Sequence, residues 1–395
     1  MDARRTGPRA RVDVRRDPAT DPAGRPVTDP VPPTITERRF PCAQCGATLA
    51  FSPGAQALVC PHCAHTNPAP QPESPVEELD FRAAVAALGL DAPRQEHMVI
   101  RCDACGAETH EQGNRTALRC PFCGSNIVAT AKARTQIKPN ALLPFATTRR
   151  QAEDLFNQWM GALWFAPSDL KRRVRHDGRL VGMYVPFWTF DCDATTQYTG
   201  QRGDAYTVSV PYTTRINGRS VSRIRNERRV RWSPRAGSVF NHFNDVLVLA
   251  AESLPEPHAR RLEPWDLQAL VPYADDYLSG FSAECYSVDL AAGFERAVRI
   301  MQPTITAAVQ ADIGGDEQRI NSMSTTRSAI RFKHVLLPVW LNAYRYRNKS
   351  YRFLVNARTG EIQGERPYSP WKILAAVLLA LAILGVVVLI VRSRG

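Results

Sequence analysis

Eight of the ten cysteines in this 395-residue sequence fall into four C-x-x-C pairs. Fourteen residues separate the first two pairs, and fourteen separate the last two. Two residues between cysteines allow one tight turn to present two thiolates, and Zn²⁺ takes four such ligands in a tetrahedron. The spacing therefore predicts two zinc sites. The first would be formed by Cys42, Cys45, Cys60 and Cys63, and the second by Cys102, Cys105, Cys120 and Cys123.

Each set of cysteines needs a short β-hairpin to bring its two pairs together. We therefore expect zinc ribbon 1 over residues 40–66 and zinc ribbon 2 over residues 100–130. A full shell of four cysteines leaves no open coordination position, so both zinc ions would be structural. Thiol redox motifs and iron–sulfur clusters are the alternatives. The residue after a pair is a glycine in three cases, where a positive φ is favoured, but the fourth is Ala64, whose turn we expect to be slightly strained.

The charges of the ribbons favour protein partners over nucleic acid. Residues 40–66 contain no Lys, Arg, Asp or Glu, and residues 101–128 carry three arginines against three acids. A four-cysteinate zinc centre is itself anionic, whereas nucleic-acid binding requires cations that meet phosphates. Ribbon 1 is also rich in apolar residues for its size. We expect these to form an exposed docking surface: Leu49, Phe51, Leu58 and Val59.

The only long apolar run lies at the C-terminal end. Residues 373–391 are nineteen consecutive apolar residues, which span about 28 Å as a helix, close to the roughly 30 Å of a bilayer core. Four cations lie in the twenty or so residues before this segment, and two arginines follow it. This bias, together with the reducing compartment that free thiolates require, predicts a single-pass tail anchor with the bulk of the chain cytoplasmic.

The remaining segments divide by composition. Residues 1–39, rich in arginine and proline, predict a disordered tail, and residues 67–99 a linker with a short helix. Residues 140–370 predict an α+β domain with mostly antiparallel sheet. Thr148 and Gln151 resemble a capping box, and a second helix is expected at roughly 290–302. Short strands are expected at 182–190, 205–212, 221–232 and 245–251, with a turn at Asn217-Gly218.

An arginine-rich hairpin stands out within this domain. Residues 215–235 hold eight arginines and one acid, Glu227, and contribute +7 to the net charge of +12. Strand alternation puts four arginines on one face, Arg223, Arg225, Arg229 and Arg231. Ile224, Val230 and Trp232 share the other face, which we expect to pack against the domain. The cationic face is either merely solvated, or bound to anionic lipid, or, less favoured because it lacks interleaved aromatic residues, bound to nucleic acid.

Sequence motifs of common enzymes are absent. The sequence contains no G-x-x-x-x-G-K-[ST], no H-E-x-x-H and no G-x-S-x-G. His242 and His334 lie near apolar strands and are interpreted as structural. We therefore expect a non-enzymatic, membrane-tethered adaptor that displays two zinc ribbons on the cytoplasmic face for docking of a protein partner. The alternative is a membrane-tethered nucleic-acid-binding protein that uses the hairpin 215–235.

Several strand motifs together resemble one bacterial family. They are MYVPFWTFD (183–191), YTGQRGDAY (198–206), RW (231–232), AECYSVDL (283–290), FKHVLLPVWLNAY (332–344) and TGEIQGERPYSPWK (359–372). The family is that of TFIIB-type zinc-ribbon membrane proteins, often automatically labelled primosomal protein N′ or replication factor Y. The resemblance covers roughly residues 100–391 and implies a cytoplasmic ribbon module, an α+β domain and a C-terminal anchor. It also implies partners among band-7 (SPFH) and phage-shock-type membrane-stress proteins.

Overall fold

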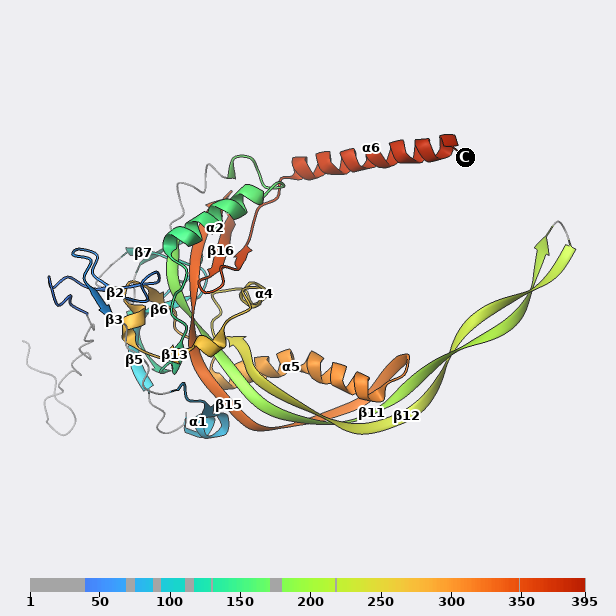
Figure 1. Ribbon diagram of the computed structural model, residues 1–395, viewed down its shortest axis with the longest axis horizontal. Helices are drawn as coiled ribbons and strands as arrows, with labels where there is room; N and C mark the ends of the chain where they lie inside the picture. Colours follow the sequence, from blue (N-terminus) through green and yellow to red (C-terminus); the bar gives the residue numbers. More distant parts are fainter. Residues whose placement is uncertain are drawn as a thin grey trace, which may run out of the picture. The chain divides into compact units, whose positions relative to one another are not determined.

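The computed structural model confirms an α+β fold in which antiparallel strand pairing predominates (Figure 1). It describes residues 40–68, 75–87, 94–110, 117–128, 131–170, 180–216, 219–347 and 349–394. The tail predicted over residues 1–39 and the turn residues Asn217 and Gly218 lie outside these ranges.

The N-terminal third contains short strands and one short helix. They are β1 (Ala50–Ser52), β2 (Ala57–Val59), β3 (Thr66–Pro68), β4 (Leu79–Asp80), α1 (Phe81–Ala87), β5 (Arg94–Arg101), β6 (Glu108–His110), β7 (Ala117–Arg119), β8 (Asn126–Val128) and β9 (Ala131–Ile137). Strands β1 to β3 form one small antiparallel sheet, β6, β5 and β9 a second, and β7 and β8 a third.

The rest of the chain forms the main domain and the C-terminal helix. Its elements are β10 (Ala141–Leu142), α2 (Arg149–Ala162), β11 (Val181–Ile216), β12 (Arg219–Leu249), α4 (Glu256–Arg260), the 3-10 helix η1 (Leu267–Ala269), β13 (Val271–Pro272), the 3-10 helix η2 (Asp275–Leu278), β14 (Ser282–Ala283), α5 (Leu290–Ile313), β15 (Glu317–Tyr346), β16 (Lys349–Asn356), β17 (Ile362–Gly364) and α6 (Pro370–Arg394). Within the described residues, the main sheet has nine strands, with β11 between β12 and β15.

Strands β11 and β12 are far longer than the sequence predicted. The separate runs expected at 182–190 and 205–212 belong to one continuous strand, β11, as do those at 221–232 and 245–251 in β12. Glycines inside these long strands permit close packing. A Cβ atom at Gly203 would lie 2.9 Å from the Trp232 ring, and one at Gly237 would lie 2.8 Å from the Tyr198 hydroxyl.

Both helices expected in the domain are present. The capping box of α2 is confirmed, since the Thr148 hydroxyl accepts from Gln151 N and the Gln151 side chain accepts from Thr148 N. Helix α5 is longer than the predicted 290–302 and is capped by Asp289, which accepts from Ala292 N at 2.7 Å. It lies along β11, β12 and β15 and buries one face against them (Figure 1). That face comprises Leu290, Gly293, Ala297, Met301, Ile305, Val309 and Ile313.

The two ribbons pack on opposite faces of the main sheet. Successive residues of a strand point to opposite faces. On β11 and β15, Tyr184 and Leu336 belong to a core cluster shared with ribbon 1, whereas their neighbours Val185 and Leu337 belong to one shared with ribbon 2. Cysteines contribute to both clusters. Cys42 and Cys60 pack on the first face, and Cys102, Cys120 and Cys123 on the second.

The apolar residues of ribbon 1 face the protein's own domain. Phe51 is only 4% exposed, and its ring centroid lies 5.1 Å from that of Tyr277. Backbone contacts accompany this packing, because Phe51 N donates to Ser279 O at 3.0 Å and Ser279 Oγ donates to Leu49 O at 2.6 Å. Leu49 and Leu58 are also buried. The prediction that these side chains form an exposed docking surface is therefore wrong.

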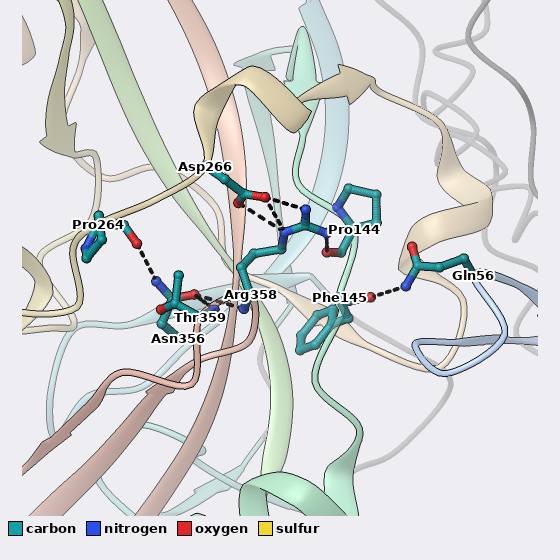
Figure 2. Close-up of polar contacts among 8 residues, drawn as sticks. All are labelled: Gln56, Pro144, Phe145, Pro264, Asp266, Asn356, Arg358 and Thr359. Atoms are coloured by element: carbon teal, nitrogen blue, oxygen red, sulfur yellow. Dashed lines mark hydrogen bonds and ion pairs between the residues drawn. The ribbon is translucent and has the colours of Figure 1, made fainter.

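Polar contacts fix the segment of the domain that receives ribbon 1 (Figure 2). Gln56 Nε2 of the ribbon donates to Phe145 O at 2.7 Å. The preceding carbonyl, that of Pro144, accepts from Arg358 at 3.2 Å, and Arg358 forms an ion pair with Asp266. The buried Asn356 side chain accepts from the backbone N–H groups of Arg358 and Thr359 and donates to Pro264 O. These contacts order the turn that carries Arg358.

Residues 75–87, in the predicted linker, lie against the main sheet. Leu79 of β4 pairs with Phe332 of β15, and Glu78 accepts from Lys333 Nζ at 3.0 Å. Lys333 also contacts Asp245 at 2.7 Å. Burial opposes the charge of Lys333, but its hydrogen bonds to Asp245 and Glu78 raise its pKa, so it remains a cation. The ion pairs therefore attach the segment between the ribbons to the domain.

The packing of Phe51 leads to a test of ribbon docking. Replacing Phe51 with Asp should lower the free energy of unfolding by at least about 3–5 kcal/mol, because the variant loses a buried aromatic ring and buries a carboxylate. Urea titration of the detergent-solubilised protein measures this. Ala55→Asp, on the exposed turn of the same ribbon, should change stability little. Equal effects of the two variants would contradict the docking described here.

Candidate metal centres and basic hairpin

The structure gathers the eight paired cysteines into the two predicted clusters. In each cluster all four sulfurs lie within 4.8 Å of one another. In the first, Cys42 and Cys63 are 3.6 Å apart and Cys45 and Cys60 are 3.4 Å apart, measured between Sγ atoms. In the second, both corresponding distances are 3.6 Å, between Cys102 and Cys123 and between Cys105 and Cys120. The remaining cysteines, Cys192 and Cys285, are buried and lie outside both clusters.

These distances fit a tetrahedral metal ion. Thiolates at about 2.3 Å from Zn²⁺ are about 3.8 Å apart, whereas a disulfide requires about 2.05 Å. The four donors are soft sulfurs, the set preferred by zinc. Because the four cysteines complete the shell, a bound ion would have no position left for substrate or catalytic water.

The same backbone turn presents the two cysteines of each pair. In the first turn, Gly46 N donates to Cys42 O at 2.9 Å and Cys42 N donates to Ala47 O at 2.7 Å. The other three pairs repeat both hydrogen bonds. The residue after each pair has a positive φ, between +59° and +76°. Ala64 adopts φ +59°, which is costly for a residue with a Cβ, as predicted.

Hydrogen bonds favour one thiolate in each cluster. A backbone N–H of Cys63 holds the pKa of Cys60 below its usual value, and the hydrogen bond from Cys120 lowers the pKa of Cys105. A metal ion binds the thiolate form, so Cys60 and Cys105 are the ligands whose hydrogen bonds already favour that form.

The second cluster lies deeper in the protein than the first. Phe122, between two of its ligands, has no exposed surface, and its carbonyl accepts from Arg352 Nε of β16 at 2.9 Å. Cys285 N donates to Glu108 O at 3.0 Å and joins β6 to the segment after β14. A metal ion here would stabilise the main domain as well as the ribbon.

The arginine-rich hairpin extends beyond the rest of the main sheet (Figure 1). Strand β15 begins at Glu317, opposite Gly203, so residues 204–216 of β11 pair only with β12 among the described strands. The paired segment 204–231 carries seven arginines against two acids, a net charge of +5. We call residues 204–231 the free hairpin.

The pairing register of the free hairpin corrects two expectations. The face opposite the four arginines packs only in part, because Trp232 contacts Arg319 of β15 at 3.9 Å from the ring centroid, whereas Ile224 is 71% exposed. The arginine face also contains aromatic residues, which come from the other strand, because Tyr206 lies opposite Arg229 and Tyr212 opposite Arg223. Their rings contact further arginines, Arg231 over Tyr206 at 5.5 Å and Arg225 over Tyr212 at 5.9 Å from the ring centroids. Both tyrosines are exposed.

One acid moderates the charge of the arginine face. Glu227 forms ion pairs with Arg225 and Arg229. The hydrogen bond from Arg225 is the main cause of its lowered pKa. On the opposite face, Arg228 forms an ion pair at 2.7 Å with Glu317, the first residue of β15. The face therefore combines rings and partly neutralised guanidinium groups, an arrangement that suits an anionic partner with exposed π or apolar surface.

The C-terminal helix is long and apolar enough to span a membrane, over Pro370–Ser393. Trp371 and Lys372 stand at its start, and Arg392 near its end. Such residues are enriched at membrane–water interfaces.

The fold and its clusters define an α+β protein with two four-cysteine sites and one apolar C-terminal helix. No protein-family profile and no solved structure matches the chain. It is similar to a Bacillus subtilis (strain 168) protein, the uncharacterized protein YdjG, with 24% identity over 341 residues, which cover 85% of this chain and 92% of that protein.

The clusters lead to a test of metal content. Purified protein should contain two zinc ions per chain by elemental analysis, because each cluster offers a closed set of four sulfurs. Replacing Cys102 and Cys105 with Ser should remove one ion and lower the Tm, since that cluster packs in the domain core. Cys192→Ser, a buried thiol outside both clusters, should leave two ions bound. A single ion, or iron–sulfur absorbance, would contradict this assignment.

Proposed function

We propose that the protein is a non-enzymatic, membrane-tethered adaptor whose two zinc ribbons hold the main domain together and whose free hairpin binds a protein partner. The observation that carries the proposal is the contrast between buried ribbons and exposed hairpin. Leu49, Phe51 and Leu58 pack inside the protein, whereas Tyr206 and Tyr212 are exposed between arginines.

The ribbons support the proposal as structural elements. Modules of some thirty residues rarely bury enough surface to fold alone, and a metal ion or a shared core supplies the missing stability. Both are available here, because each cysteine cluster contributes side chains to a core on one face of the main sheet. Zinc would therefore stabilise the scaffold and take no part in chemistry.

Helix α6 provides the membrane tether in this proposal. Four cations precede the apolar segment within about twenty residues, Arg352, Arg358, Arg366 and Lys372, and two arginines follow it. This asymmetry favours a cytoplasmic main domain in a bacterial inner membrane. The eight clustered cysteines, whose closest sulfurs are 3.4–3.6 Å apart and form no disulfide, fit the same reducing side.

The arginine face favours an anionic partner. Aromatic residues and arginine are the types enriched at the centres of protein interfaces, where they supply most of the binding energy. An acidic protein surface meets both the charge of the free hairpin and its exposed rings. A membrane-stress protein of the band-7 or phage-shock type is the candidate that the family resemblance supplies.

Nucleic-acid binding is the second candidate, and one observation favours it. Single-stranded nucleic acid is bound by cationic surfaces with interleaved aromatic rings. Tyr206 and Tyr212 provide such rings on the arginine face, about 20 Å apart at about 3.4 Å per residue.

Photo-crosslinking from the free hairpin in cells distinguishes these candidates. A photoreactive residue in place of Tyr206 should give a discrete protein adduct, and the adduct should be lost when Arg223, Arg225, Arg229 and Arg231 are replaced by Ser, because the charges that attract the partner are removed. Nuclease-sensitive adducts without a protein adduct would replace the adaptor with the second candidate.

Two matched controls accompany this experiment. A photoreactive residue at Phe240, an exposed aromatic residue of β12 where β11 also pairs with β15, should not capture the partner. Replacing Arg149, Arg150, Arg260 and Arg261, which are exposed elsewhere, removes the same charge and should preserve the adduct.

The membrane tether is tested by deletion and proteolysis. Removal of residues 373–395 should release the protein from membranes, because α6 is the one described helix able to span a bilayer. Protease added outside intact spheroplasts should leave the main domain uncut. Cleavage from outside would contradict the cytoplasmic orientation and leave the anchor itself intact.

A further inference from the structure

The loop that follows α2 turns two aromatic side chains outward. Leu163, Ala166 and Leu170 are buried in a small core with Tyr344 and Tyr346. Between them, Trp164 is 79% exposed and Phe165 is also exposed. An aromatic ring exposed to water contributes no hydrophobic stabilisation to the fold. Two such rings on one loop therefore indicate contact with an apolar environment outside the protein.

The first turn of α6 fixes this loop in place. Lys372 Nζ donates to the carbonyls of Trp164, at 3.2 Å, and Ala166, at 2.8 Å. Ser369 N donates to Phe165 O at 2.7 Å. The exposed rings are therefore held beside Trp371, itself 78% exposed, at the start of the apolar helix.

A groove separates the loop from the helix. Its volume is about 680 Å³, and its walls are mostly apolar. On one side lie the end of α2 and the loop, including Gly161 and Leu163, and on the other lie residues of the span, Ala375, Ala376 and Leu379. Leu379 is seven residues past Lys372, or about 10 Å deeper along a helix.

We propose that Trp164 and Phe165 lie in the headgroup region of the bilayer and that the groove holds an acyl chain of a membrane phospholipid. The proposal rests on the membrane tether of the proposed function. One wall of the groove belongs to the spanning helix, so lipid is the medium that reaches it. Lys372, which also lines the groove, has three donors, two of which bind the loop carbonyls, and the third suits a lipid phosphate.

This arrangement gives the domain a second contact with the membrane. Tryptophan prefers the interface because its ring is apolar and its N–H is polar. A single span leaves a domain free to rotate about its linker, whereas a second contact fixes its orientation. The acyl chain replaces the water that would otherwise face the apolar groove.

Fluorescence quenching by lipid tests the position of Trp164. The full-length protein is placed in vesicles whose phospholipids carry bromine on the acyl chains, next to the headgroup. Trp164→Phe and Trp371→Phe should each remove part of the quenchable emission. Trp232→Phe, in the main sheet where the ring stacks on Arg319, should remove none.

The outcomes separate this inference from the tether on which it rests. If Trp371→Phe reduces quenching and Trp164→Phe does not, α6 is inserted and the second contact is overturned. If neither variant reduces quenching, α6 is outside the bilayer, and both the tether and the second contact are overturned.

A photoreactive phospholipid tests the groove itself. A diazirine on the acyl chain should label residues 160–170 as well as α6. Gly161→Leu should fill the groove and abolish labelling of residues 160–170, since a Cβ there meets no atom within 4 Å and the fold should tolerate the change. Gly385→Leu, equally open and far along the span, should leave that labelling intact. Labelling confined to α6 in the unaltered protein would overturn the proposal.

Discussion

Burial of the main sheet on both faces is the constraint on which the rest of the structure depends. Every residue of β11 from Gly182 to Cys192 is buried. A strand buried on both faces needs a covering layer on each side. The two ribbons provide part of these layers, together with α2, α4 and α5, and neither ribbon has a core separate from that of the main sheet. Sheet and ribbons therefore depend on each other for stability. In each cysteine cluster the four sulfurs lie within 4.8 Å of one another, so a metal ion bound there would stabilise both the ribbon and the sheet.

The same strand passes through two further environments. From Cys192 to Gly200 buried residues mainly alternate with less buried ones, because α5 covers one face. Beyond Gly203, β12 is the one described strand that pairs with β11, and the side chains of β11 become more exposed. The free hairpin therefore lies beyond the covering layers and the first residue of β15. The hairpin is accessible because β15 and the covering layers are shorter than β11 and β12. The residues of β11 in the hairpin, mainly Val, Thr and Tyr, are typical of any strand and do not predict this exposure.

Features encoded by local spacing could be predicted from the sequence, and those that depend on tertiary partners could not. The cysteine sets, the capping box of α2 and the apolar C-terminal helix each occupy one short segment. The strands were predicted too short because β11 and β12 pair with each other from Phe187–Leu249 to Ile216–Arg219, and this pairing is not visible in either segment alone. The apolar excess of ribbon 1 was visible, but its partner, Tyr277, lies more than two hundred residues away. Likewise, the tyrosines of the arginine face come from the opposite strand, and only the register reveals them.

The arginines of the free hairpin also solve a problem that its exposure creates. A two-stranded ribbon has unpaired backbone groups along both edges, which invite pairing with another copy. Rows of like charge make such self-association unfavourable, and Pro211 removes one backbone donor from β11. Such edges disfavour the addition of a further strand and leave the side chains as the surface that the proposed partner would contact. Because Glu227 already neutralises part of the charge on Arg225 and Arg229, a partner must compete with an internal carboxylate. Selection then depends on the combination of anionic groups and apolar surface that Tyr206 and Tyr212 can contact.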